Sequence, residues 1–464
     1  MKKYLNKGAS PSCISPTPEG CSVRFVAQLG LDQSFLKKFA PLALCVLLAA
    51  CSSGPPPLPN QEPELRQLSE TGYVPKRKYG TTTLRENWGS PDARIDVSVI
   101  APSSAGDVPF PLVVYLPGLG EPATAGQLWR KAWAEAGYSV VSIQPAALTE
   151  EIWGSRQARE GDFQGMARDK YTVQESIARL RMLDTALAEI RRRAAAGTAP
   201  YSQADPTNIV LAGFELGAYT ASLAAGERMS GTAGERVSGA AGERVPVNTP
   251  ARKPDIRALI TLSPYYNRNT TDAEARYEAM SLPVLAITGS DDDDPFHLVR
   301  DPELRKSPWR LMPSGAKYLL SITGGTHTML AGDGFYDTNI SREQSDADEA
   351  ARKREQQRGM DPPSGQRRRR FDEPRLDAIP GSMNADQSDR GARGEQASRD
   401  ESNLRRLRPV KIAPIPFNLN HLAAVTSVST AFLDAHLRSD ARARKWLSED
   451  AARWLGAASQ LQLR

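Results

Sequence analysis

The chain has 464 residues, of which 40% are hydrophobic and 24% are charged, and its formal net charge is +5. The hydrophobic fraction is typical of a globular protein and excludes a chain that is disordered throughout. Residues 1–50 hold six Lys or Arg side chains against two acidic ones, so the remainder of the chain has a net charge of only +1. The overall charge therefore gives no support to a nucleic-acid partner, and we expect none.

Residues 1–50 predict a leader for export. Two lysines precede an apolar run at residues 39–50 that is too short to span a membrane. The letters "LAAC" at residues 48–51 resemble the bacterial lipobox, in which cleavage precedes a cysteine that becomes lipidated. We therefore expect a lipoprotein of the bacterial cell envelope, anchored in the membrane through Cys51. Ser52 favours the periplasmic side of the outer membrane, and an ordinary signal peptide is the alternative.

The next segments predict a tether and then a folded domain. Residues 51–70 are rich in proline and predict an extended tether. "ARIDVSVIAP" alternates like an antiparallel edge strand. Helical patterns then alternate with apolar runs, which read "FPLVVYLPG", "YSVVSIQP", "NIVLAGF", "ALITLSPYY", "LPVLAITGS" and "KYLLSITGG". Such runs favour a parallel sheet buried on both faces, so we predict a doubly wound α/β domain over residues 71–337 and 409–464.

Two insertions interrupt this domain. Residues 224–250 carry a repeat with a period of eight, which is too short for a solenoid layer and indicates an expanded surface loop. Residues 338–408 have few apolar side chains and many charges of both signs, which predicts a disordered segment. Arg367–Arg370 within it could touch nucleic acid or anionic lipid, but the mixed charge around them favours a solvated linker.

The stretch "AGFELGAYTA" has the pattern of a strand, a tight turn and a helix. Gly213 and Gly217 flank the turn with the spacing of a nucleophile elbow, G-x-S-x-G, in which the turn exposes a serine. Glu215 occupies the serine position. We therefore predict that Glu215 lies at the tip of the elbow.

Further candidates follow other strands in the order nucleophile, acid, histidine. Asp292 lies in the run of four aspartates at residues 291–294 and is our choice for the acid, while His327 follows the next strand. "YLPGLGEP" matches an oxyanion loop, with the backbone N–H groups of Leu119 and Leu216 as the donors. The four aspartates lack the spacing of metal ligands, so we predict no metal and no cofactor.

These segments together resemble the α/β-hydrolase superfamily, in the dienelactone hydrolase branch with bacterial esterases and acetylhydrolase-type lipases. The resemblance is carried by "LPGLGEP", "AGFELGAYTA", "ITGSDDDDPF", "GGTHTM" and "AFLDAHL", and it covers roughly residues 93–337 and 409–455. It implies the α/β-hydrolase fold and a serine hydrolase that acts on esters. The chain departs from the family at the decisive residue, because Phe214-Glu215 replaces the usual His-Ser pair.

A carboxylate at the elbow changes the chemistry. Attack of Glu215 on an ester carbonyl would form a mixed anhydride, and the adduct would expel the carboxylate, whose conjugate acid has a pKa of about 4, rather than the more basic alkoxide. On saturated carbon, a carboxylate can displace halide or open an epoxide, as an aspartate does in haloalkane dehalogenases and epoxide hydrolases of the same fold. Water activated by the histidine–acid pair then cleaves the enzyme ester.

Two hypotheses remain open at this stage. The first is an envelope lipoprotein with a hydrolase-type site formed by Glu215, Asp292 and His327, acting on a small organic substrate. The alternative is a catalytically inactive lipoprotein that uses the hydrolase frame as a binding or scaffold domain, with a small organic ligand in the same pocket.

Overall fold

The structure is a computed structural model that describes residues 58–104, 108–229, 236–238, 244–246, 255–266, 273–337 and 414–464. The expected leader, the lipidation site at Cys51 and the charged insertion at residues 338–408 lie outside these ranges, as do parts of the repeat loop. The described residues from Gln61 onward belong to one compact unit.

The centre of this unit is a nine-stranded sheet in the order β1-β2-β4-β3-β5-β8-β9-β10-β13. The strands from β4 to β10 in this order are parallel, and β1, β2 and β13 are antiparallel to their neighbours. This arrangement confirms the prediction of an α/β fold with a mostly parallel sheet. The strands are β1 (Thr81–Trp88), β2 (Ile95–Pro102), β3 (Phe110–Leu116), β4 (Ser139–Pro145), β5 (Ala204–Phe214), β8 (Ile256–Leu262), β9 (Val284–Asp291), β10 (Lys317–Thr326) and β13 (Ser459–Leu463).

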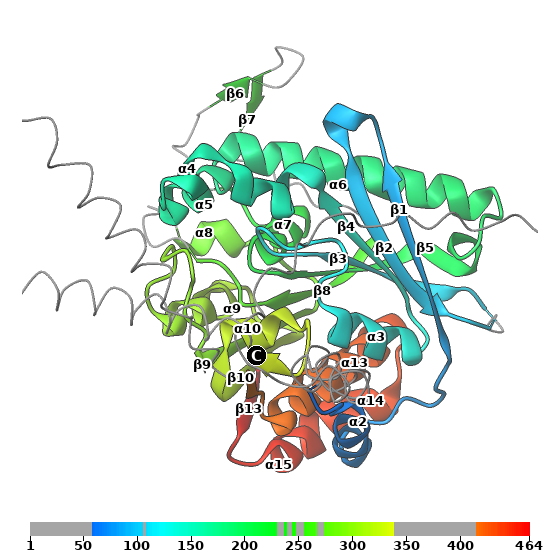
Figure 1. The fold of residues 1–464 in the computed structure, drawn as a ribbon. Helices are drawn as coiled ribbons and strands as arrows, with labels where there is room; N and C mark the ends of the chain where they lie inside the picture. The colour runs from blue at the N-terminus through cyan, green and yellow to red at the C-terminus, as the bar shows by residue number, and fades with distance from the viewer. Residues whose placement is uncertain are drawn as a thin grey trace, which may run out of the picture. The chain divides into compact units, whose positions relative to one another are not determined.

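Helices cover both faces of the sheet (Figure 1). Helices α6 and α7 lie on one face, and α3 and α13 lie on the other. The helices are α2 (Glu62–Thr71), α3 (Gln127–Glu135), α4 (Arg156–Arg159), α5 (Phe163–Lys170), α6 (Val173–Ala195), α7 (Leu216–Ala224), α8 (Ala273–Tyr277), α9 (Ser307–Leu311), α10 (His327–Ala331), α13 (Leu419–Leu437), α14 (Ala441–Lys445) and α15 (Ala451–Leu455). None of those in the described part of the chain combines the length and apolar character needed to cross a bilayer.

Strand β3 shows why these sequences form central strands. All seven of its residues are buried. Leu112 and Val114 belong to the core beneath α6 and α7, whereas Val113 and Tyr115 belong to the core beneath α3 and α13. Because successive side chains of a strand point to opposite faces, a strand covered on both sides must be apolar throughout. Full burial of each such side chain contributes roughly 1.5–3 kcal/mol.

Several elements were not predicted. Helix α2 forms within the segment expected to be an extended tether, so the tether ends earlier than residue 70. Leu65 of α2 is buried and Leu68 packs against the same core, which explains why this segment is helical. The predicted edge strand, β2, is antiparallel as expected but is not at the edge, because β1 pairs with it on the outer side. Strand β13 forms the opposite edge. Part of the repeat loop pairs as a hairpin of β6 (Arg236–Ser238) and β7 (Arg244–Pro246), and β11 (Tyr336–Asp337) pairs with β12 (Ile415–Pro416).

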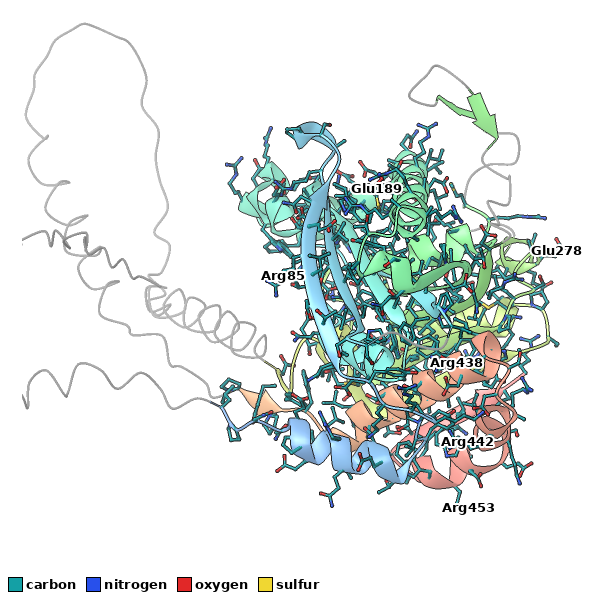
Figure 2. All side chains as sticks on the ribbon, turned by 90° about the vertical axis from the view of Figure 1, so that its right-hand side faces the viewer. Arg85, Glu189, Glu278, Arg438, Arg442 and Arg453 are labelled. Atoms are coloured by element: carbon teal, nitrogen blue, oxygen red, sulfur yellow. The ribbon has the colours of Figure 1, made fainter. Side chains whose placement is uncertain are left out.

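A polar cluster joins the segment after α2 to helix α13. The buried carboxylate of Asp434 accepts hydrogen bonds from the hydroxyls of Tyr73 (2.7 Å) and Tyr138 (2.6 Å) and from the guanidinium of Arg438 (2.8 Å). Figure 2 shows Arg438 on the same side of the molecule as Arg442, which donates to the backbone oxygen of Val74. These bonds fix the N-terminal part of the compact unit to its C-terminal helices.

Candidate functional site

Glu215 lies at a sharp turn between β5 and α7, as the elbow pattern predicts. Its φ of 49° and ψ of −109° are unusual for a residue with a side chain, and such backbone strain clusters at functional sites. The flanking glycines are sterically required. A Cβ at Gly217 would lie 1.9 Å from the backbone oxygen of Leu116, and one at Gly213 would lie 2.5 Å from the carbonyl carbon of Gly217.

The carboxylate of Glu215 points into the protein, and the residue is only 4% exposed. Its Oε2 accepts the backbone N–H of Leu119 at 2.9 Å, and its Oε1 accepts the hydroxyl of Tyr171 at 3.0 Å. Burial raises the pKa of Glu215, the nearby His327 opposes this shift, and the charge of Asp294 adds to it. The N–H group predicted to hold a substrate oxyanion is thus already bonded to the protein's own carboxylate.

Asp292 and His327 form the second half of the site. Nδ1 of His327 lies 2.8 Å from Oδ1 of Asp292, and the hydroxyl of Ser263 lies 2.7 Å from the same oxygen and 3.0 Å from Nδ1. The hydroxyl of Thr288 donates to Oδ2 at 2.8 Å. The structure therefore pairs the predicted acid with the predicted histidine.

A buried arginine compensates the charge of Asp292, which is 0% exposed. Nε of Arg305 lies 3.3 Å from Oδ1 of Asp292 and donates to its backbone oxygen at 3.0 Å. Burial alone would raise the pKa of Asp292, but Arg305, His327 and the hydroxyl of Ser263 outweigh it, and the pKa is lower than usual. The acid is therefore ionised and fixed, as is required of a group that orients an imidazole.

The three predicted residues meet at one edge of the sheet. Glu215 follows β5, Asp292 follows β9 and His327 follows β10, and the carboxyl ends of these parallel strands lie together. The ring of His327 contacts that of Phe214, with 4.7 Å between the ring centroids. No side chain in the described part of the chain bonds Nε2 of His327, so this nitrogen is available to act on a water molecule or a substrate.

The remaining predicted residues differ in their settings. Leu216 is the first residue of α7, so its N–H has no acceptor within the helix. Asp294 is buried and holds the turn after β9, because its carboxylate accepts N–H groups from Phe296 (2.9 Å), Leu298 (2.6 Å) and Val299 (2.7 Å). Within the residues that the structure describes, no three His, Cys, Asp or Glu side chains are grouped to hold a metal ion.

Sequence reasoning missed three residues of the site. Tyr171 lies within the long helical pattern near residues 168–193, but the structure breaks that helix between α5 and α6 and turns the hydroxyl toward Glu215. Ser263 follows β8 with a φ of 51°, which the sequence does not signal. Glu121 accepts the N–H of Gly118 at 2.7 Å, next to the N–H that Glu215 accepts. It stands in the quoted stretch "YLPGLGEP", so its position in the predicted oxyanion loop was the available signal.

A short segment covers this site. Leu148, Ile152 and Met166, between β4 and α6, pack against the two predicted oxyanion residues, Leu119 and Leu216. These apolar contacts are consistent with the low exposure of Glu215, and an electrostatic interaction is stronger at such a buried position than in water.

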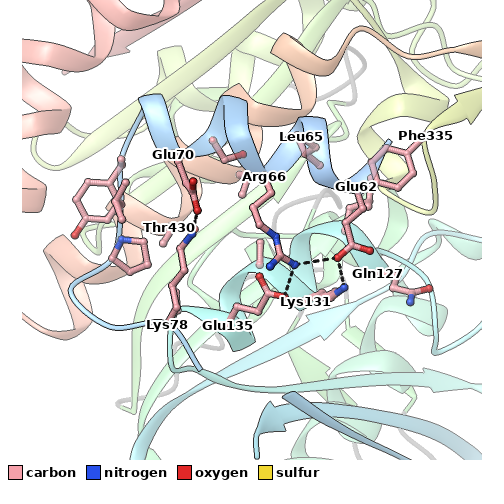
Figure 3. Close-up of a pocket in the computed structure, with 18 of the residues that line it drawn as sticks. Glu62, Leu65, Arg66, Glu70, Lys78, Gln127, Lys131, Glu135, Phe335 and Thr430 are labelled. Atoms are coloured by element: carbon pink, nitrogen blue, oxygen red, sulfur yellow. Dashed lines mark hydrogen bonds and ion pairs between the residues drawn. The ribbon is translucent and has the colours of Figure 1, made fainter. Parts of the chain in front are cut away.

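A separate cavity of about 290 Å³ lies between α2 and α3, away from the elbow (Figure 3). Ion pairs cross it, with Lys131 bonded to Glu62 at 2.5 Å and Arg66 lying 3.9 Å from Glu135. These side chains are partly exposed, so each pair contributes little to stability. Glu215, Asp292 and His327 do not line this cavity.

The geometry resembles a catalytic triad in which a carboxylate replaces the alcohol. It provides a buried carboxylate held by two donors, an imidazole fixed by an ionised acid, and a tyrosine hydroxyl aimed at the carboxylate. Comparison with protein-family models and with curated proteins finds no match for this chain.

Proposed function

We propose that the protein is a hydrolase that acts on a small organic electrophile at a saturated carbon, through a covalent ester on Glu215. The observation that carries this proposal is the pair of bonds on the Glu215 carboxylate, with Leu119 N–H on Oε2 and Tyr171 on Oε1. Placement of nucleophile, acid and histidine after β5, β9 and β10 supports assignment of the domain to the α/β-hydrolase fold.

In the first step, Oε1 of Glu215 attacks the substrate carbon and the bond from that carbon to the leaving group breaks. The N–H of Leu119 keeps Oε2 in place, so Oε1 is the oxygen that faces the substrate. The hydroxyl of Tyr171 must turn from Oε1 toward the substrate during this step. Burial and the charge of Glu215 raise the pKa of Tyr171 well above its ordinary value, so its hydroxyl stays protonated as a donor.

In the second step, water cleaves the ester. His327 accepts the proton of the water through Nε2, while Asp292 stabilises the imidazolium through Nδ1. The oxyanion that forms on Oε2 already has a donor in the N–H of Leu119. The N–H of Leu216, the residue after Glu215, has no acceptor within α7 and is the second donor. The two predicted oxyanion donors therefore serve the enzyme ester rather than a substrate carbonyl.

One observation favours the alternative of a binding protein. Glu215 is nearly inaccessible, and each of its oxygens already accepts a hydrogen bond, from Leu119 or from Tyr171, which suits a site that holds a ligand without reacting. In either case we place the domain in the cell envelope, tethered through Cys51, on the strength of the lipobox resemblance alone. A small organic molecule is the expected occupant in both cases.

Trapping of the ester tests the proposal. In the full chain with His327→Gln, the second step is blocked while the nucleophile is intact. We expect incubation with styrene oxide or a primary alkyl bromide to add one substrate-derived group to the intact mass, and peptide mapping to locate it on Glu215. The matched control, Glu215→Gln with His327→Gln, should stay unmodified.

Two outcomes would contradict this function. Failure of both probes to modify Glu215 would remove the nucleophile from the account. Esterase activity that appears only on Glu215→Ser, with an inert wild-type chain, would favour the binding protein on a hydrolase frame.

A further inference from the structure

A surface rich in Lys and Arg lies where the turn after α2 meets α14. Residues 74–79 and 436–445 together hold seven Lys or Arg side chains and one acid, Asp440. The two segments lie side by side, because Lys76 pairs with Asp440 at 3.0 Å and Arg442 donates to a backbone oxygen of the turn at 2.8 Å. Figure 2 shows where Arg442 lies on the molecule. We call these two segments the basic face.

Three arginines of the basic face have no acid within ion-pairing distance among the described residues. Arg77 and Arg442 lie over tyrosine rings, at 4.8 and 5.3 Å from the ring centroids. Arg444 donates to a backbone oxygen of α13 at 3.1 Å. These contacts hold the three side chains in place and leave their charges unpaired. The other four basic side chains each have an acid, in the pairs Lys76–Asp440, Lys78–Glu70, Arg438–Asp434 and Lys445–Glu449.

The basic face lies at the amino ends of the parallel strands. Arg438 donates to the backbone oxygen of Ala136 at 2.8 Å, shortly before β4 begins. Asn208, in the first half of β5, donates to a backbone oxygen at the end of α13 at 3.3 Å. Glu215 and His327 instead follow the carboxyl ends of β5 and β10. A strand rises about 3.3 Å per residue, so the ten residues of β10 separate the two edges by roughly 30 Å.

Positive charge continues beneath α14, at the start of β10. Lys317 is the first residue of β10 and is 1% exposed, and its Nζ has no hydrogen-bond partner among the described residues. Burial, with the charges of Arg444 and Lys317, lowers the pKa of His436 to about 4. Two cations thus act on one buried group, which indicates a positive potential at this edge of the sheet.

The expected anchor determines which large anion is always close to the basic face. Cys51, which we place in the membrane, precedes Gln61, where the compact unit begins, by ten residues. Ten residues span at most about 36 Å, and α2 adds about 15 Å before the turn. A bilayer is therefore within reach of the basic face at all times, and a short tether makes even weak attraction effective. A nucleic acid has no such connection to the chain.

We propose that the basic face binds the anionic phospholipids of the membrane surface, so that the elbow faces away from the bilayer and takes its substrate from the aqueous phase. This orientation rests on the proposed placement of the domain in the cell envelope and not on the chemistry of Glu215. Each Lys or Arg near an anionic leaflet strengthens binding by about fivefold. Arginine also forms paired hydrogen bonds with phosphate oxygens, which suits the three unpaired guanidinium groups.

Vesicle binding tests the basic face. The full chain with Cys51→Ser, which removes the expected lipid, is sedimented with vesicles of phosphatidylcholine that contain or lack phosphatidylglycerol. Arg77→Gln, Arg442→Gln and Arg444→Gln together should weaken binding to the anionic vesicles by about 10²-fold. In about 1 M NaCl, where the Debye length is about 3 Å, the chain with all its arginines should bind no better than this variant.

The matched control carries Arg156→Gln, Arg159→Gln and Arg168→Gln. These exposed arginines belong to α4 and α5, which Figure 1 shows far from α14, and we expect a change of less than about threefold. Equal losses for the two variants would overturn the proposal, because binding would then follow net charge alone. Lost affinity of the first variant for a short DNA duplex, with unchanged vesicle binding, would assign the basic face to a nucleic acid and also overturn it.

Lysine acetylation tests the orientation and needs no substitution in the basic face. Lys76 and Lys445 belong to that face and are 73% and 68% exposed, whereas Lys170 ends α5 next to Tyr171 of the elbow site. On the anionic vesicles, acetic anhydride should label Lys76 and Lys445 severalfold more slowly than in solution, and Lys170 at an unchanged rate. Protection of Lys170, or of none of the three, would overturn the proposed orientation.

Palmitate labelling tests the placement in the cell envelope separately. We expect the wild-type chain to be labelled and Cys51→Ser to be unlabelled. Labelling that survives this substitution would overturn the anchor and, with it, the membrane as the partner of the basic face. Failure of the vesicle and acetylation tests alone would overturn only the role of the basic face.

Discussion

The two halves of the site shift the pKa of a carboxylate in opposite directions. Asp292 is surrounded by groups that stabilise its charge, namely Arg305, His327 and Ser263, and its pKa is lowered despite complete burial. Burial raises the pKa of Glu215 despite the opposing effect of His327, and burial together with the nearby Asp333 and Glu215 raises the pKa of Glu121 strongly. The surroundings of Asp292 stabilise its negative charge, whereas those of Glu215 and Glu121 stabilise a negative charge only in part.

Under the proposed mechanism, this difference separates the carboxylate that orients the imidazole from the carboxylate that reacts. A fully compensated carboxylate is a poor nucleophile and a good support, which suits Asp292 beneath His327. A carboxylate with a raised pKa is more basic and gains more when it forms a bond, which suits Glu215. Catalytic groups are commonly found where neighbouring titratable groups have pKa values that are pushed apart.

The largest effect, on stability, is expected when Arg305, the cation beside Asp292, is replaced. Arg305→Met leaves the buried Asp292 without its cation, and we expect the free energy of unfolding to fall by about 3–5 kcal/mol in denaturant titrations. Because the pKa of Asp292 is depressed in the native protein, its stabilising contribution is present above the ordinary value of 3.8 and is lost as the pH falls through the folded pKa. That loss should begin at a higher pH in Arg305→Met.

Arg156 supplies the matched control. Its side chain is 85% exposed and pairs with Glu160 on the surface, so Arg156→Met should change stability little. Similar losses for the two variants would contradict the compensation of Asp292 by Arg305.

A smaller effect, on the pH dependence of adduct formation, is expected from removing one hydrogen-bond donor to Glu215. Tyr171→Phe takes the hydroxyl from Oε1 of Glu215, so the carboxylate is less stabilised and its pKa rises further. We expect the acid limb of the pH–rate profile for adduct formation to move about one unit to higher pH, since a hydrogen bond to a charged group contributes roughly 1.5–3 kcal/mol. If the acid limb of the profile stays where it is, the hydrogen bond from Tyr171 does not control the pKa of Glu215.

The smallest effect concerns stability around Glu121. Its folded pKa lies above the ordinary value of 4.5, so the native state binds the proton more tightly than the unfolded state. The free energy of unfolding of the wild type therefore falls as the pH rises from 4.5 through the folded pKa, and Glu121→Gln removes that fall. Thermal melts should show no difference near pH 4 and a Tm gain for Glu121→Gln of roughly 2–4 °C at pH 8, for about 1 kcal/mol. A gain of the same size at both pH values would contradict this pKa direction.

The predictable part of the molecule is the part that is buried on both sides. Central strands such as β3 are apolar throughout, and the elbow requires its two glycines because a Cβ at either would lie only 1.9 or 2.5 Å from a backbone atom. Edge strands escaped prediction because their exposed faces are polar, as the Thr-rich β1 shows. Helix α2 escaped because only Leu65 and Leu68 mark its buried face.

The candidate site shows the same contrast between residues that the sequence predicts and residues that it does not. Glu215, Asp292 and His327 each follow an apolar strand, and their place at the ends of these strands was predicted from that pattern. Tyr171 and Ser263 reach the site through a helix break and a positive φ, which depend on tertiary packing rather than on local pattern. Glu121 was visible in the loop, but only the structure shows that its carboxylate accepts the N–H of Gly118, next to the N–H of Leu119 that Glu215 accepts.

The central claim is that an oxygen of Glu215 enters the product. A single turnover of an epoxide with excess wild-type protein in ¹⁸O-labelled water tests it directly. The account predicts an unlabelled diol and one heavy oxygen in the peptide that carries Glu215. Heavy oxygen in the diol from the first turnover, with none on Glu215, would mean that water attacks the substrate itself and would contradict the account.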